Sequence, residues 1–240
     1  MISRTKIIQH LIHINEKLFF YPKLKKFYEN KLSKNDTIIF DVGCNKGQSL
    51  EFFLKINKHC KFYAFEPNVS LFKKLQKNYM DNSKINFYNL GVSNINGELI
   101  FKQNLMDETS SFEDLNYNSI YLERKAKILG VSKENLVIDE YKVKVITLSS
   151  FLSDNNIKNI DVLKIDVEGH ELKCLLGLFN NVILNTNIRY IQLEKHNDDM
   201  YLNENNTYEI KELLNNNLYK EVACINHGFG GIQEVIYEKL

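Results

Sequence analysis

The sequence has 240 residues, of which 31 are Lys or Arg and 30 are Asp or Glu, so the formal net charge is +1. This length can bury a sizeable core in one large domain, or in a domain with an added cap. A charge so close to zero gives no overall field for nucleic acid, and no nucleic-acid partner is expected. There is no apolar run of about 18 residues and no signal-peptide pattern, so we expect no transmembrane segment. The 4 cysteines form no C-x-x-C pair, which favours a reducing, cytoplasmic location.

Residues 1–35 are expected to form an N-terminal helical cap. Apolar side chains recur at helical spacing up to Phe20, and Pro22 is expected to end this helix. Lys23–Asn35 is then a second short helix or a linker. Because the segment is basic, one interpretation is a helix that lies on an anionic membrane surface. We favour a cap packed on the domain, because Ile12 and Phe20 broaden the apolar face in the way that burial requires.

The most informative stretch follows this segment. An apolar strand, Thr37–Asp41, leads into a glycine loop and then into an amphipathic helix over Gln48–Ile56. Gly43 and Gly47 are spaced G-x-x-x-G, which lacks the middle glycine of dinucleotide loops and the G-K-[ST] ending of phosphate loops. An acid two residues before the first glycine suits a cationic ligand. S-adenosylmethionine fits, since Asp41 can hold its ammonium group and the amides that open the helix can hold its carboxylate.

A second acid supports a nucleoside-bearing cofactor. The next strand, Lys61–Glu66, ends in Glu66, about twenty residues on, where a carboxylate can accept both ribose hydroxyls. From Thr37 onward strands and helices alternate, which predicts an α/β fold with a mainly parallel seven-stranded sheet and helices on both faces. The other strands are expected at Ile85–Asn89, Asp161–Asp166, Ile188–Glu194, Tyr219–Cys224 and Gln233–Glu238. The other helices are expected at Val69–Tyr79, capped by Asn68 or Ser70, and at Gly169–Leu178 and Thr207–Asn216.

Residues 98–147 interrupt this alternation. Glu98–Lys102 and Lys142–Thr147 are expected to be strands that pair antiparallel. The polar span between them is expected to carry a helix over Tyr117–Leu129, which Gly130 ends as a C-cap. An insertion this long in a compact domain is often a lid or a binding element, and a plain surface excursion is the alternative.

A second acidic corner lies at Asp161–Asp166, a strand that also ends in an acid before a helix. Ligands of open α/β sheets lie outside the carboxyl ends of the strands, so Asp41 and Asp166 are expected to face one crevice. Asp166 then lies near the reactive methyl group. Glu194 and His196, at the end of the next strand, are candidates for contacting the methyl acceptor. One of these three side chains takes a proton as a base, or Asp166 and Glu194 hold a Mg²⁺ that acidifies the acceptor hydroxyl.

Four blocks of the sequence resemble FkbM-type S-adenosylmethionine-dependent methyltransferases, over roughly residues 36 to 240. The blocks are Asp41–Gly47, Phe65–Asn68, Asn89–Ser93 with Gly97, and Leu163–Glu171 with Gly177. The last of them, L-K-I-D-V-E-G-H-E, is the most specific. The resemblance implies a class I methyltransferase domain over 36–240, Rossmann-like and with a reversed final strand.

The resemblance also implies roles for individual residues. The loop from Asp41 to Gly47 is implied to hold the methionine part of the cofactor, Glu66 the ribose, and Asp166 the reactive centre. The full set implied to bind the cofactor is Asp41, Gly43, Cys44, Asn45, Gly47, Glu66, Pro67, Asn68, Gly91 and Asp166. Cys44 departs from the pattern, because the family usually has a smaller residue there.

By the same resemblance, the expected reaction transfers a methyl group from S-adenosylmethionine to a hydroxyl of a sugar, polysaccharide or related natural product, and leaves S-adenosylhomocysteine. The expected partner is therefore a glycan or small-molecule acceptor. One alternative is an NAD-dependent sugar-modifying enzyme, which the missing middle glycine disfavours. Another is a non-catalytic nucleoside-binding module, which the intact acids Asp41, Glu66 and Asp166 disfavour. A nucleic-acid methyltransferase is disfavoured by the absence of an N-P-P-[YF] signature and of a cationic stripe.

Overall fold

The computed structural model describes residues 4–32, 36–179, 186–202, 206–228 and 231–240. The strands of its main sheet are β1 (Ile38–Val42), β2 (Lys61–Phe65), β3 (Ile85–Tyr88), β7 (Asn159–Ile165), β8 (Asn187–Lys195), β9 (Tyr219–Asn226) and β10 (Gln233–Lys239). Their order is β3-β2-β1-β7-β8-β10-β9. β10 pairs antiparallel with both neighbours, and the other pairs are parallel. The expected seven-stranded sheet with a reversed final strand is confirmed.

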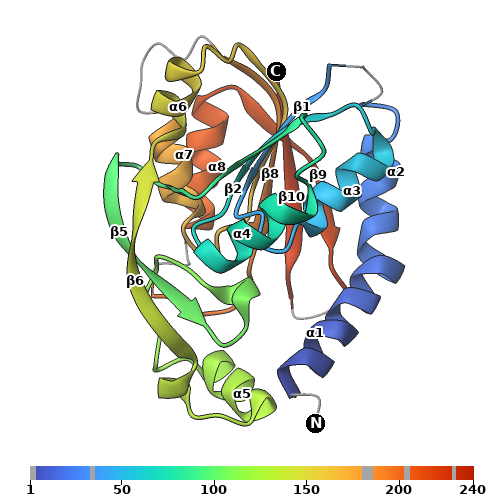
Figure 1. Ribbon diagram of the computed structural model, residues 1–240. Coiled ribbons are helices and arrows are strands. Elements are labelled where there is room, and N and C mark those ends of the chain that lie inside the picture. The colour runs from blue at the N-terminus through green and yellow to red at the C-terminus, as the bar shows by residue number, and fades with distance from the viewer. Residues whose placement is uncertain (1–3, 33–35, 180–185, 203–205, 229–230) are drawn as a thin grey trace.

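Helices cover both faces of this sheet (Figure 1). One face carries α2 (Tyr21–Tyr28), α3 (Gln48–Ile56) and α4 (Val69–Asn78), and the other carries α6 (Leu148–Asp154), α7 (Glu171–Phe179) and α8 (Thr207–Asn216). Consecutive residues of β1 point to opposite faces, and both faces are packed. Ile39 belongs to the cluster under α2 and α3, whereas Phe40 belongs to the cluster under α6, α7 and α8. A strand buried on both faces explains why its sequence is apolar without alternation.

Local signals set the helix ends. Asn68 caps α4, because its Oδ1 atom accepts hydrogen bonds from the amides of Ser70 and Leu71 at 2.9 and 3.2 Å. Helix α3 begins after Gly47, whose φ of +88° favours glycine. Helix α6 lies where the sequence analysis predicts no helix. Thr147 caps α6 by accepting a hydrogen bond from the amide of Ser150. The apolar side chains of α6 pack in the core, a role that is evident only in the folded structure.

The opening segment differs from the expectation. α1 (Arg4–Asn15) continues through a π-helical turn, Glu16–Phe20, directly into α2. Pro22 therefore does not break the helix, because it lies in the first turn of α2, where the missing amide hydrogen costs little. No side chain of α1 is fully buried, although Ile8 and Ile12 are partly buried against the insertion, and packing on the main sheet starts at Phe20. Residues 33–35 of the expected second helix lie outside the described part of the chain. No described helix meets the length and apolarity needed to span a membrane.

The insertion forms a separate three-stranded sheet, with the order β4-β6-β5. Its elements are β4 (Gly91–Val92), β5 (Gly97–Asn104), 3₁₀ turns at Asp107–Thr109 and Lys133–Asn135, α5 (Ile120–Leu129) and β6 (Val137–Ile146). β5 and β6 pair antiparallel as expected. Helix α5 starts later than expected, because Ser119 caps it through the amide of Leu122, and Gly130 ends it at φ +76°. α1 and α5 extend beyond the same end of the main sheet (Figure 1).

Candidate active site

The glycine loop after β1 is held against the ends of β2 and β7. The amides of Gly43 and Cys44 donate to the Phe65 carbonyl at 3.0 and 3.1 Å. Gly43 has a φ of +83°, and a Cβ atom added there would lie 1.9 Å from the Asp166 carbonyl oxygen. Only glycine allows the loop to come this close to β7, so the loop passes directly over the tip where Asp166 stands.

Asp41 is fully buried near the end of β1. Its Oδ2 atom accepts a hydrogen bond from the Ser49 hydroxyl, whereas Oδ1 is buried with no hydrogen-bond partner among the described residues. Burial raises the pKa of Asp41, although Lys164 and the Ser49 bond oppose the rise. A buried acceptor left unpaired is costly, and a cationic donor group of a ligand would satisfy it.

Glu66 sits at the tip of β2 between two backbone amides. Its Oε1 atom accepts from the Asn68 amide and its Oε2 atom from the Asn45 amide, both at 2.8 Å. Burial raises the pKa of Glu66 to about 7, although the two amide bonds lower it. Asn45 has a φ of +46°, and its Oδ1 atom is buried without a hydrogen-bond partner. The carboxylate is fixed in orientation while each of its oxygens keeps a lone pair for a ligand hydroxyl.

A cavity opens beside this loop and collects most of the residues expected to bind the cofactor. Those that line it are Gly43, Cys44, Asn45, Glu66, Pro67, Asn68, Gly91 and Asp166. Asp41 and Gly47 lie behind the lining and support the loop. A Cβ atom at Gly91 would lie 2.4 Å from the Phe112 ring of the insertion, so the insertion closes tightly on this cavity. We call it the donor cavity.

Asp166 follows β7 and is paired. Its Oδ2 atom accepts a hydrogen bond from the Lys164 ammonium group at 2.7 Å. Burial raises the pKa of Asp166, but the charge and the hydrogen bond of Lys164 outweigh it, so the pKa lies below its usual value. Asp166 therefore presents a stable negative charge to the donor cavity and is a poor proton acceptor near neutral pH.

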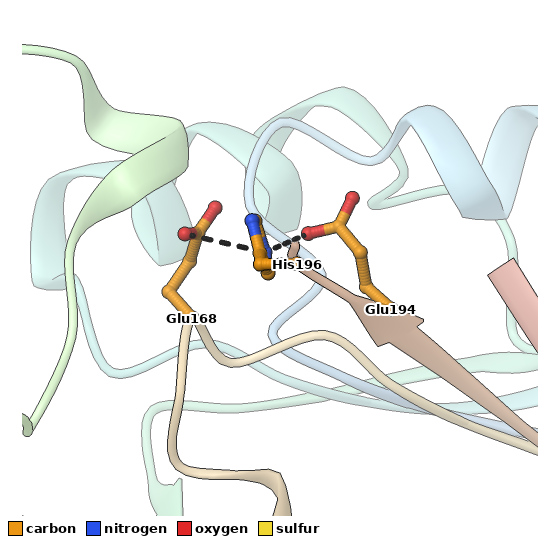
Figure 2. A group of neighbouring side chains, drawn as sticks. All are labelled: Glu168, Glu194 and His196. Carbon is orange, nitrogen blue, oxygen red and sulfur yellow. Dashed lines mark hydrogen bonds and ion pairs between the residues drawn. The ribbon is translucent and has the colours of Figure 1, made fainter. Parts of the chain in front are cut away.

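Glu168, His196 and Glu194 form a second group, which Figure 2 shows with both carboxylates pointing toward the imidazole. His196 Nε2 lies 2.8 Å from Glu194 Oε2 and 3.7 Å from Glu168 Oε2. Glu194 and His196 come from the end of β8, and Glu168 from the loop after β7. Glu168 has a φ of +56°, which is unusual for a residue other than glycine and marks a constrained loop.

The protonation of this group follows from its geometry. Burial lowers the pKa of His196, but the charges of Glu168 and Glu194 outweigh it and raise the pKa well above its usual value. Burial also raises the pKa values of Glu168 and Glu194, and His196 opposes both shifts. His196 is therefore the group that carries positive charge, and a carboxylate with a raised pKa is the better matched base.

A larger cleft of about 780 Å³ lies between α1 and the insertion. Much of its wall is apolar, with Ile8 and Ile12 on the side of α1 and with Met106, Tyr121, Leu129 and Met200 facing them. Glu168 and Glu194 line both this cleft and the donor cavity, and His196 lines the cleft alone. We call it the acceptor cleft. The three expected catalytic residues thus divide, with Asp166 in the donor cavity, His196 in the cleft and Glu194 in both.

The structure adds residues that the sequence analysis does not single out. Lys164 and Glu168 lie inside the specific block around Asp166, so their position was a signal that could have been used. His227 and Glu234 also line the donor cavity, but they lie in no recognisable motif. Among the described residues, two groups have metal-ligand spacing: Glu168–Glu194–His196 and Glu194–His227–Glu234. Neither group contains Asp166, which was expected to share a Mg²⁺ with Glu194 and which pairs with Lys164 instead.

The sheet order, the glycine loop and the carboxylates at four neighbouring strand ends define a Rossmann-like domain of the class I methyltransferase type. The family model described as the methyltransferase FkbM domain matches residues 41–221, and the chain belongs to this family. The resemblance seen in the sequence is confirmed, and the protein is a methyltransferase.

Three relatives illustrate how far the similarity extends. The 2-O-methyltransferase NoeI of Sinorhizobium fredii is 26% identical over 172 residues, 71% of this chain and 68% of that protein. Methyltransferase 1 of Beauveria bassiana is 27% identical over 169 residues, 65% of this chain and 64% of that protein. The crystal structure of methyltransferase FkbM from Methylobacillus flagellatus matches 85% of this chain and 44% of that chain, with a TM-score of 0.51 and 14% identity. This last likeness concerns the fold alone.

Proposed function

We propose that this enzyme transfers the methyl group of S-adenosylmethionine to a hydroxyl group of a sugar, polysaccharide or related natural product. The observation that carries the proposal is the position of Glu194, a carboxylate that lines both the donor cavity and the acceptor cleft. A methyl transfer needs a donor and an acceptor that meet at one point, and Glu194 lies where the two spaces join. The relative NoeI is a 2-O-methyltransferase, which supports oxygen as the atom that is methylated.

The residues of the donor cavity fit S-adenosylmethionine. The Glu66 carboxylate, which lines the cavity, suits the ribose hydroxyls. Asp41 lies behind the lining, where its unpaired Oδ1 atom adds an acceptor that suits the ammonium group. The ionised side chain of Asp166 adds a negative charge that favours a cationic donor. Gly43 and Gly47 let the loop lie close to the end of β7 and to α4, which leaves room for a ligand against the start of α3.

The chain contributes alignment, charge and a base to the reaction. When bound, S-adenosylmethionine supplies a methyl group on a positively charged sulfur. A hydroxyl group is a weak nucleophile until its proton is removed, and Glu194 is placed to accept that proton. His196, held between Glu168 and Glu194, fixes the orientation of the base and balances its charge. Holding two reactants in line can contribute roughly 7–11 kcal/mol to lowering the barrier.

Binding of the donor is tested first. Calorimetry with S-adenosylhomocysteine should show one site per chain, and NAD should show none. Because a ligand that binds only the folded state raises its melting temperature, a thermal shift should follow the same order. Absence of binding by the folded chain would contradict the choice of donor.

Transfer is tested next, with donor labelled in its methyl group and a panel of glycans and small hydroxylated molecules. Glu194→Gln should lower turnover by about 10²–10⁴-fold, the usual contribution of a general base, while the affinity for S-adenosylhomocysteine stays within about threefold. Glu212→Gln, an exposed carboxylate on α8, is the matched control. Equal turnover in the Glu194→Gln variant and the control would exclude Glu194 as the base.

A further inference from the structure

His227 presents a buried nitrogen atom that has no hydrogen-bond partner. The residue is 7% exposed, and its Nε2 atom is among the buried polar atoms without a partner in the described chain. It faces two carboxylates, with Glu234 Oε1 at 3.7 Å and Glu194 Oε1 at 4.0 Å. These distances exceed a hydrogen bond and are those of ion pairs, so the three atoms face one another without being hydrogen-bonded.

We propose that Glu194, His227 and Glu234 form a binding site for a divalent cation at the junction of the donor cavity and the acceptor cleft. One ligand atom from each residue lies within 4.8 Å of the other two. Two ligands that share a metal with bonds of about 2.0–2.2 Å lie about 3 Å apart, so small rotations of the side chains complete the site. One imidazole and two carboxylates suit a first-row cation such as Mn²⁺ better than Ca²⁺, which prefers oxygen ligands alone.

The outer contacts of the three side chains are those of metal ligands. Each carboxylate is held through its other oxygen, since Glu194 Oε2 lies 2.8 Å from His196 Nε2 and Glu234 Oε2 accepts from Gln192 Nε2 at 2.9 Å. The atoms Glu194 Oε1 and Glu234 Oε1 thereby stay directed at His227 Nε2. Such second contacts commonly orient the ligands of a metal site.

His227 is oriented in the same way from its far side. Its Nδ1 atom lies 3.6 Å from Glu16 Oε1 in the π-helical turn, and its ring stacks on Phe20 with the centroids 3.9 Å apart. The Asn15 amide donates to the His227 carbonyl at 3.0 Å. At 3.6 Å the Glu16 carboxylate is not hydrogen-bonded to the ring, but its negative charge lies on the side of the imidazole away from Nε2. The N-terminal segment therefore takes part in building the site.

The position of the site gives the cation a role that rests on the proposed function. Glu194 and His227 line both cavities, whereas Glu234 lines the donor cavity alone. A cation held by three protein atoms keeps positions for further oxygen ligands, and an acceptor hydroxyl bound there loses its proton more easily. With the cation bound, Glu194 serves as a ligand, and Glu168 is the carboxylate beside His196 that remains to take the proton. The cation binding itself does not depend on that role, so the two can be tested separately.

The test uses the full chain, freed of metal with a chelator and then titrated with Mn²⁺, with free Mn²⁺ followed by electron paramagnetic resonance. We expect one site per chain. Glu234→Gln and His227→Gln should each weaken it by at least about tenfold, the smallest loss usual when a metal site is disturbed. Glu212→Gln removes the same charge from an exposed position on α8 and should leave the affinity within about twofold.

Two results would overturn the site. One is wild-type protein that binds no Mn²⁺ at about 1 mM, the weak end of functional divalent sites. The other is loss of binding in His196→Gln but not in His227→Gln, which would place the cation between Glu168, Glu194 and His196 instead. Melting curves without metal check that each variant folds, and Glu234→Asp keeps the carboxylate if Glu234→Gln does not fold. S-adenosylhomocysteine binding in the same samples separates failure of the metal site from failure of the proposed function.

Discussion

Gly43 is the residue whose geometry is least replaceable. It combines a φ of +83° with a gap too small for a Cβ atom, which would lie 1.9 Å from the Asp166 carbonyl. We expect Gly43→Ala to cost more than the about 1–2 kcal/mol of left-handed backbone strain alone, because the loop must also move off β7. The displaced loop should lose S-adenosylhomocysteine binding. Chemical denaturation and calorimetry measure the two effects.

Gly231→Ala is the matched control for Gly43→Ala. Gly231 has a φ of +72°, but the nearest atom to an added Cβ lies 3.9 Å away. It shares the backbone strain without the steric clash, and the loss should be about 1 kcal/mol. If both variants lose the same stability, the close approach of the loop to β7 is not what requires glycine at residue 43.

Glu171 should make the stability of the protein depend on pH. Burial raises its pKa from 4.5 to about 7, although His196 and backbone amides lower it. The folded state therefore holds this proton more tightly than the unfolded state. The stabilisation is fully present below about pH 4.5 and is lost as the pH rises toward about 7.

Glu171→Gln cannot lose a proton, so its free energy of unfolding should fall less between pH 5 and pH 8 than that of the wild type. The difference should reach up to about 3 kcal/mol, from about 1.4 kcal/mol per pKa unit. Urea denaturation at several pH values measures it. Glu212→Gln, an exposed carboxylate, should keep the wild-type slope, and a Glu171→Gln slope as steep as that of the control would count against the burial of this charge.

At the level of elements, the main sheet could be predicted because its signals are local. The strands are apolar runs that end in acids or turns, and α3 has the predicted bounds, Gln48–Ile56. The course of the N-terminal segment could not be predicted in the same way. Pro22 is tolerated in the first turn of α2, directly after a π-helical turn, and α1 packs only Ile8 and Ile12, partly buried, against the insertion. Both facts depend on contacts with distant parts of the chain.

The residues of the candidate site could likewise be predicted only in part. Carboxylates at strand ends are visible in the sequence, because the topology of an open α/β sheet brings such ends together. His227 and Glu234 are not visible. Their neighbours include Glu16 and Glu194, and His227 lies 212 residues from the Asn15 side chain that donates to its carbonyl. No local pattern reports a contact over that separation.

The insertion positions Glu168 through one hydroxyl group. Ser111 Oγ donates to the Glu168 carbonyl at 2.7 Å, and the Ser111 backbone pairs with Lys102 of β5. This bond helps to hold Glu168 at its φ of +56°. We expect Ser111→Ala to lower the stability by about 1 kcal/mol and to lower turnover, because Glu168 no longer holds His196 in place. Binding of S-adenosylhomocysteine should change little.

Ser110→Ala is the control for Ser111→Ala. The Ser110 hydroxyl accepts a hydrogen bond from the Asn104 amide at 3.0 Å, a contact inside the insertion. Its loss should cost similar stability without lowering turnover. The comparison of melting temperature with turnover in the two variants decides the point. A parallel loss of turnover in both would mean that the insertion acts only through its overall stability.

At the scale of the whole molecule, three segments far apart in the sequence meet around Glu108. Gln9 of α1 donates to Glu108 Oε2 at 2.7 Å, and Lys46 of the glycine loop donates to Glu108 Oε1 at 2.6 Å. α1, the loop and the insertion thus enclose the acceptor cleft together. Residues that line only one of the two cavities should therefore affect only one of the two ligands.

Two substitutions test whether donor binding and acceptor binding can be weakened separately. Tyr121→Ala removes an aromatic wall of the acceptor cleft and should raise the acceptor KM about tenfold, which corresponds to about 1.4 kcal/mol of lost contact. The affinity for S-adenosylhomocysteine should stay unchanged. Glu66→Gln should weaken the binding of S-adenosylhomocysteine and leave the acceptor KM unchanged, because Glu66 lines the donor cavity and not the acceptor cleft. Tyr117→Ala, at an exposed tyrosine outside the lining, controls for loss of a ring from the insertion. A Tyr121→Ala variant that weakens donor and acceptor equally would mean that the two cavities act as one site.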